Sequence, residues 1–112
     1  MAAVLERVAE FESEFANLKA KRDAEDAHVL RKLLDLLRGF AGDDQAFHSL
    51  LKNSQQALGI EDDDLSHHLK VNRSTISRWT RGVTAPHAVM QESSVKIIAR
   101  LVESRLRQLR SQ

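Results

Sequence analysis

Arginine, serine and threonine side chains are concentrated between positions 73 and 81 of this chain. A guanidinium group can donate two hydrogen bonds to O6 and N7 of guanine, and a short hydroxyl can reach a base edge or a nearby phosphate. Arg73 and Arg78 are therefore candidates for base contacts, with Ser74 and Ser77 as shorter partners. The chemistry that these residues predict is recognition of double-stranded DNA rather than catalysis.

Apolar residues in the same region indicate the elements that would hold these side chains outward. Leu65 and Leu69 lie four residues apart and share one helix face, while Ile76 and Trp79 lie three apart and share another. The two faces can pack on each other, which leaves the basic and hydroxyl side chains outside. The stretch Asp62–Gly82 is therefore predicted to form two short helices joined by a tight turn, with Trp79 in the core.

This stretch resembles the helix-turn-helix of the Cro/repressor class, often called XRE-type DNA-binding domains. The similarity covers roughly residues 45–101 and rests on Leu65, Leu69, Val71 and the run 74–79. It implies a small helical domain that reads the major groove and represses transcription. In this family the residues that face the bases correspond to Arg73, Ser74, Ser77 and Arg78. Phosphate contacts are expected at Thr75, Arg81, Thr84 and His87, and Lys70 in the turn is a further candidate.

The chain departs from the family pattern at the turn and at the start of the first helix. Lys70 stands where glycine is usual, because the backbone there favours the left-handed conformation, so modest strain is predicted. Thr80 replaces a usual glutamate, and the acidic run Asp62–Asp64 replaces a glutamine that helps to hold a phosphate. Carboxylates would repel phosphates, but they also cap a helix start and suit its dipole. Capping is the interpretation that we favour.

Charge is divided unevenly along the 112 residues. The overall net charge is only +1, yet residues 1–64 carry 8 Lys/Arg and 14 Asp/Glu, a net charge of −6, and residues 65–112 carry 9 and 2, a net charge of +7. Basic charge that accompanies the predicted helix pair is what binding to DNA requires. An equally weighted alternative is that the Lys and Arg residues from Lys96 onward form the solvated face of a helix.

Several function classes are disfavoured by the composition. Without cysteine there can be no disulfide, thiolate metal site or thiol nucleophile. His67 and His68 are adjacent and diverge on a helix, and His28 and His48 lack a partner at ligand spacing. There is also no glycine-rich phosphate loop, so we expect no enzyme, cofactor or metal. With apolar runs too short to cross a bilayer and no signal-peptide pattern, a soluble, cytoplasmic protein is expected.

Helix formers dominate the rest of the chain, and a single proline and four glycines leave little room for sheet, which predicts an all-α fold. Residues 45–58 are predicted to form a helix, with Asp43 or Asp44 at its start and Gly59 at its end. A loop at 82–86 would precede a long helix over 87–108. We expect a domain over residues 43–112. The predicted core positions of the two helices are Phe47, Leu50, Leu51, Leu58, Val95, Ile98, Val102, Leu106 and Leu109.

Residues 1–42 are expected to form a helical extension with one or two helices between Ala2 and Arg38. This segment begins with apolar residues at heptad spacing, which form a seam. The apolar pattern is interrupted by charged residues at 22–26, and a dense apolar stretch follows at 29–37. We favour self-association into a homodimer, because two recognition helices on a two-fold dimer would meet half-sites one helical turn apart. The alternative is a helix folded back over its own domain. The seam consists of Val4, Val8, Phe11, Phe15 and Leu18.

A second function class remains open. The helix pair could be a retained scaffold in an adaptor or an antitoxin that binds a protein partner, and the acidic first half of the chain favours this hypothesis slightly. A combination, in which the N-terminal helix binds a protein partner and the other half binds DNA, is a third alternative.

Overall fold

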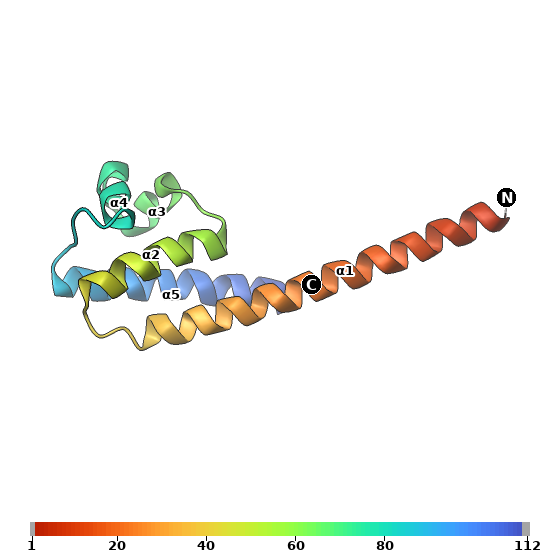
Figure 1. Cartoon of the computed structure of the whole chain (residues 1–112), viewed down its shortest axis with the longest axis horizontal. Coiled ribbons are helices and arrows are strands. Elements are labelled where there is room, and N and C mark those ends of the chain that lie inside the picture. Colours follow the sequence, from red (N-terminus) through yellow and green to blue (C-terminus); the bar gives the residue numbers. More distant parts are fainter. Residues whose placement is uncertain (1, 111–112) are drawn as a thin grey trace.

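The structure, a computed structural model, describes the backbone from Ala2 to Arg110 and the side chains of residues 17–18 and 21–110. No strand occurs within this backbone, so the predicted all-α class is confirmed. The helices are α1 (Ala2–Arg38), α2 (Asp44–Leu58), α3 (Asp62–Leu69), α4 (Arg73–Thr80) and α5 (Ala88–Arg110), shown in Figure 1.

The two longest helices, α1 and α5, pack side by side in opposite directions and form the base of the molecule (Figure 1). α2 lies along both of them, and α3 and α4 cover the far side of α2. α1 extends past the end of α5, which gives the molecule extents of 66 × 26 × 20 Å. The arrangement leaves α4 at one end of the long axis, away from the N-terminus of α1.

A single hydrophobic core connects the helices. Leu51 from α2, Leu65 from α3 and Ile76 from α4 are each at most 1% exposed, and they join Ile98 and Val102 of α5. The core positions predicted for residues 45–58 are all buried, whereas Leu106 and Leu109 are only partly buried against the core. The second half of α1 contributes to the same core through Leu30, Leu33, Leu34 and Leu37.

α2 begins and ends where its sequence indicates. The carboxylate of Asp43 accepts a hydrogen bond from the Ala46 amide at 3.3 Å, which caps the helix start. At the other end Gly59 adopts φ 67°, a left-handed conformation that glycine takes without a steric penalty. Arg105 of α5 also donates to the Leu58 carbonyl at 3.1 Å, which ties this end of α2 to α5.

α1 is one continuous helix, because no glycine or proline interrupts residues 2–38. Within the dense apolar stretch at 29–37, only one face is buried, and Val29 and Leu36 stay exposed. Leu18 is also exposed. The side chains of the other predicted seam residues, Val4, Val8, Phe11 and Phe15, lie outside the described residues. In the part of the chain that the structure describes, no helix combines the length and apolar character needed to cross a membrane.

Candidate nucleic-acid interface

α3 and α4 are joined by a turn whose first residue has the left-handed backbone predicted for it. Lys70 adopts φ 57°, the only positive φ among the described non-glycine residues. This conformation lets the Val71 amide donate to the Ser66 carbonyl at 3.1 Å, which ends α3. Ser66 itself is buried, and its hydroxyl donates to the Asp63 carbonyl at 2.6 Å.

Replacing Lys70 with glycine should stabilise the protein. The left-handed backbone costs a non-glycine residue on the order of 1 kcal/mol, and glycine removes that cost. We expect Lys70→Gly to raise the free energy of unfolding in urea by about 1 kcal/mol. Asn72→Gly is a suitable control, because Asn72 has φ −67° and gains nothing from glycine. Equal effects of the two substitutions would contradict strain at Lys70.

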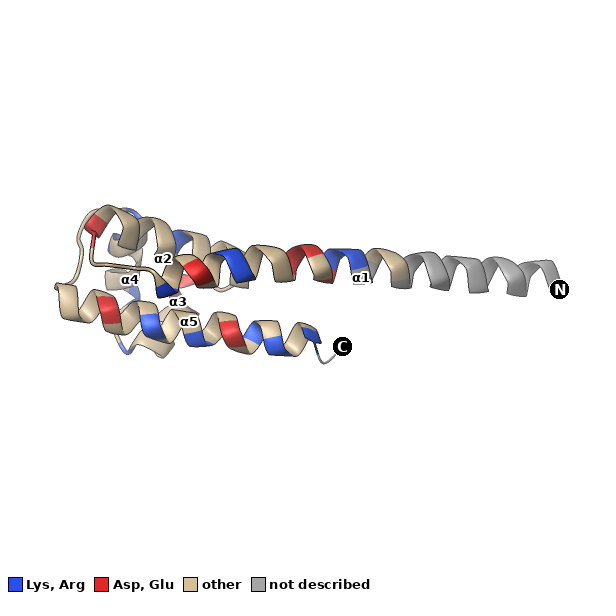
Figure 2. Cartoon of the chain, turned by 90° about the horizontal axis from the view of Figure 1, so that it is seen from below, with Lys and Arg blue, Asp and Glu red and all other residues tan. Residues whose placement is uncertain are grey.

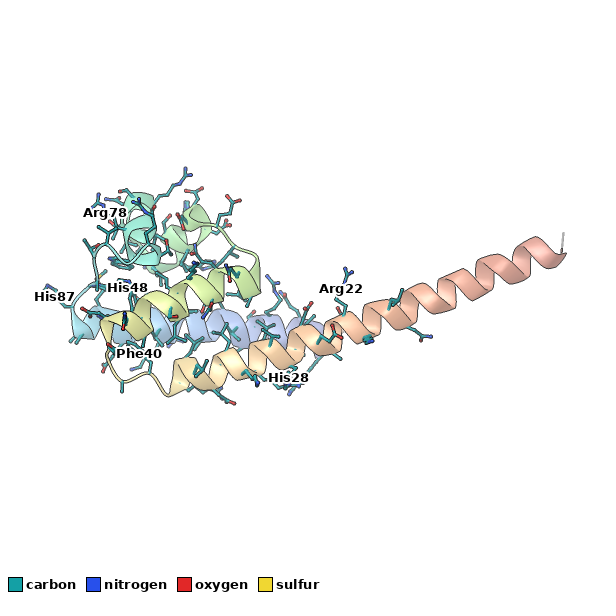
Figure 3. All side chains as sticks on the ribbon, viewed as in Figure 1. Arg22, His28, Phe40, His48, Arg78 and His87 are labelled. Atoms are coloured by element: carbon teal, nitrogen blue, oxygen red, sulfur yellow. The ribbon has the colours of Figure 1, made fainter. Side chains whose placement is uncertain are left out.

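α4 has a buried face and an exposed face. Ile76 is 0% and Trp79 4% exposed, so both turn toward the core as predicted. On the other side Arg73, Ser74 and Arg78 are exposed. Thr75 and Ser77 are half-buried at the border between the two faces. Figure 3 shows Arg78 on the outer side of α4. The helix therefore exposes three of the four predicted base-contacting residues to solvent.

Aromatic packing fixes α4 on α2. The Trp79 ring meets the Phe47 ring edge to face, with the ring centroids 5.7 Å apart and the planes at 71°. Nδ1 of His48, also on α2, lies 2.6 Å from the Trp79 carbonyl oxygen. Since a carbonyl only accepts, His48 must carry a proton on Nδ1 and donate it. Sequence reasoning missed this contact, because nothing in a lone histidine indicates a partner far along the chain.

A buried glutamine holds the loop that follows α4. Gln91 of α5 is 2% exposed, and its Nε2 donates to the Asp44 carboxylate at 2.6 Å and to the Pro86 carbonyl at 3.0 Å. The bonds fix the loop beside the start of α2. Sequence reasoning also missed the burial of Gln91. Its position four residues before Val95 places it on the buried face of α5, so this burial could have been predicted.

The candidates for phosphate contacts surround the exposed face of α4. Lys70, Arg81, Thr84 and His87 are exposed, and Figure 3 shows His87 at the same end of the molecule as Arg78. Nε of Arg81 donates to the Ser77 carbonyl at 3.3 Å, which directs the guanidinium along α4. The candidate interface thus consists of an exposed helix face, the turn before it and the loop after it.

The acidic start of α3 is partly occupied by contacts within the fold. Nε2 of Gln55 donates to the Asp62 carboxylate at 2.8 Å, and the Glu61 amide donates to the Asp64 carboxylate at 3.2 Å. α3 begins at Asp62, so the N-cap residue is Glu61 and not one of the three aspartates. Asp64 therefore caps the helix start together with Glu61, whereas Asp62 ties the helix start to α2. The capping interpretation holds for Asp64, but the N-cap position itself is not an aspartate.

The basic side chains of α4 and α5 have different surroundings. The guanidinium groups of Arg73 and Arg78 have no hydrogen-bond or ion-pair partner among the described residues. On α5, where basic and acidic residues are interspersed (Figure 2), Arg105 bonds the Leu58 carbonyl and Glu103 pairs with Arg38 at 2.8 Å. The basic residues toward the end of α5 thus include one, Arg105, that bonds within the fold, whereas the guanidinium groups of Arg73 and Arg78 make no such bond among the described residues.

Over the described range, no group of three His, Asp or Glu side chains comes together as a metal site would require. Comparison of the chain with family models, with curated proteins and with solved structures gave no match.

Proposed function

We propose that this protein is a sequence-specific, double-stranded DNA-binding regulator of transcription, in which α3, the turn and α4 act as a helix-turn-helix. The observation that carries the proposal is the exposed face of α4. Arg73 and Arg78 project from a helix whose opposite face is locked in the core, and neither guanidinium has a partner among the described residues. The core fixes the helix that carries both arginines, and their guanidinium groups are available to a ligand outside the fold.

α4 would enter the major groove, which is wide enough for a helix and displays a distinct pattern of donors and acceptors for each base pair. Arg73 and Arg78 would each donate two hydrogen bonds to a guanine, while Ser74 and Ser77 would reach neighbouring bases or phosphates. The left-handed turn at Lys70 and the loop held by Gln91 would place Lys70, Thr84 and His87 against the phosphates on either side. Phosphate contacts of this kind fix the register of the helix on the duplex.

Regulation would follow from occupancy of an operator, with repression as the simplest result. A homodimer formed through α1 would present two copies of α4 to an inverted repeat, so that each half-site needs only modest affinity. The net charge of +7 on residues 65–112 would attract DNA to this half of the chain.

Selection from a random double-stranded DNA library at moderate salt, followed by sequencing, tests this function. We expect enrichment of an inverted repeat, and no enrichment by the Arg73→Ala/Arg78→Ala variant. Since both residues are exposed, the variant should keep its helical content, which circular dichroism can check. A folded wild-type protein that enriches no sequence would refute the proposal and favour the partner-binding adaptor or antitoxin.

Arg81→Ala should weaken binding to every DNA sequence about equally, because a phosphate contact carries no sequence information. The slope of log K against log salt concentration should fall by roughly one unit, since one phosphate contact and its released counterion are lost. Affinities for operator and scrambled duplexes at several salt concentrations measure both effects. A selective loss for the operator would mean that Arg81 reads a base.

A further inference from the structure

One exposed face of α1 carries large apolar side chains. Leu18 is 67%, Val29 53% and Leu36 62% exposed. These three residues lie on one side of α1 at spacings that fit a heptad. Apolar residues in such a register are typical of a helix that pairs with a second helix. The residues with which α1 packs into its own fold lie on another face: Ala27, Leu30, Leu33, Leu34 and Leu37.

The exposed apolar residues continue the heptad of the N-terminal segment. Steps of four and three beyond Leu18 lead to positions 22, 25, 29, 32 and 36, and every one of these is exposed. Val29 and Leu36 therefore fall in register with the seam. The seam does not end at Leu18 but runs along α1, and charged residues occupy the positions between: Arg22, Glu25 and Lys32.

These charges discriminate between the two directions in which a second α1 could lie. In a parallel pair each seam residue meets its own copy, so Arg22 would face Arg22 and Glu25 would face Glu25, and both contacts repel. In an antiparallel pair Arg22 can lie opposite the partner's Glu25, and symmetry repeats the contact with Glu25 and the partner's Arg22. Two attractive pairs then flank the two-fold axis. Charge complementarity therefore favours the antiparallel direction.

The same register also matches the apolar positions. With Arg22 opposite the partner's Glu25, Leu18 falls opposite the partner's Val29, and Val29 opposite the partner's Leu18. Leu36 falls opposite position 11 of the partner, and Lys32 opposite position 15, both of which are phenylalanine in the sequence. One register thus satisfies the apolar and the charged positions together.

We propose that two copies of this chain pair through α1 in the antiparallel direction, along the seam that includes Leu18, Arg22, Glu25, Val29 and Leu36. A second α1 can reach the centre of the seam, because Arg22 lies near the point where α1 extends past the end of α5 (Figure 3). This inference specifies the homodimer of the proposed function, and it uses no property of α4.

The absence of cysteine from the chain allows a direct test with two single variants, Leu18→Cys and Val29→Cys. Both positions are exposed, so both variants should fold. In the antiparallel pair, position 18 of one copy faces position 29 of the partner. The two thiols of a dimer formed by one variant would therefore stand roughly 16 Å apart at ~1.5 Å per residue, far beyond the ~4 Å that a disulfide spans between Cβ atoms. Under mild oxidation without DNA, an equal mixture of the two variants should form a disulfide-linked dimer, and each variant alone should not.

Ala24→Cys is the matched control, since Ala24 is exposed on α1 but lies off the seam. It should remain unlinked, alone or mixed with either variant. Linkage of Leu18→Cys with itself would establish a parallel pair and overturn the antiparallel direction. No linkage in the mixture, together with a wild-type protein that sediments as a monomer, would overturn the seam altogether. DNA is absent from these experiments, so neither of these negative results contradicts the proposed reading of bases by α4. Conversely, a DNA selection that enriches no sequence would not contradict the pairing of α1.

Charge reversal tests the centre of the seam independently. Arg22→Glu should shift the sedimenting species from dimer to monomer, because two carboxylates then face each other at both central contacts. The double variant Arg22→Glu/Glu25→Arg restores opposite charges across the antiparallel seam and should restore the dimer. A dimer that is unaffected by Arg22→Glu would show that these two residues do not meet across the interface.

Discussion

Trp79→Ala is expected to lower the free energy of unfolding by about 3–5 kcal/mol, the largest effect that we expect of an alanine substitution in α4. Trp79 is 4% exposed and packs edge to face on Phe47, so alanine would leave a cavity between α4 and α2. Since the exposed face of α4 depends on its buried face, DNA binding should fall with stability. Urea denaturation followed by circular dichroism measures the loss.

Val89→Ala provides the matched control, because Val89 is 80% exposed and its truncation should change stability by no more than about 0.5 kcal/mol. The contact of His48 helps to separate the contribution of the Trp79 ring from that of the Trp79 backbone. The bond from Nδ1 of His48 involves the backbone carbonyl of Trp79 and can survive the substitution. A loss below about 1 kcal/mol would therefore mean that this bond and the helix caps, rather than the ring, hold α4 in place.

Arg78→Ala is expected to relax DNA sequence preference at one base position. A guanidinium that bonds O6 and N7 of guanine contributes about 1–3 kcal/mol of discrimination, or roughly 5- to 150-fold in affinity between the preferred base and its replacements. Affinity for the selected operator should fall by that factor, while affinity for duplexes already altered at that position should change little. Fluorescence anisotropy with a panel of single-base variants measures both.

Arg100→Ala is the matched control for this effect, since Arg100 is an exposed arginine on α5 rather than on α4. It should leave the preference among the duplexes unchanged. If Arg78→Ala weakens all duplexes equally, Arg78 contacts a phosphate, and the base-reading role proposed for it is wrong. Arg81→Ala then becomes a useful reference, because a uniform loss is what that substitution is expected to produce.

Helix boundaries could be predicted from the sequence where a cap and a periodic apolar pattern coincide. Asp43 and Gly59 bound α2 as expected, and Leu65, Leu69, Ile76 and Trp79 are all buried. The local signals are sufficient here, because a cap residue satisfies backbone groups only a few positions away. The exposed face of α4 follows from the same pattern, since burying Ile76 and Trp79 leaves the arginines outside.

Contacts between distant residues could not be predicted in this way. His48 meets the Trp79 carbonyl and Gln91 meets Asp44, but neither pair has a sequence spacing that indicates contact. The stretch at 29–37 posed another problem, because it is apolar on more than one face. Only the packing against α2 and α5 shows that Leu30 and Leu37 are buried while Val29 and Leu36 are not.

Because α1 is one uninterrupted helix, it would fix the distance between the two domains of an antiparallel dimer. With Arg22 opposite the partner's Glu25, the two Leu37 positions, the last core residues of each α1, would stand roughly 40 Å apart at ~1.5 Å per residue. No glycine or proline in residues 2–38 offers a pivot. α1 would then act as a ruler whose length sets the spacing between half-sites, and a single inserted base pair, which turns one half-site by roughly 35°, would be poorly tolerated.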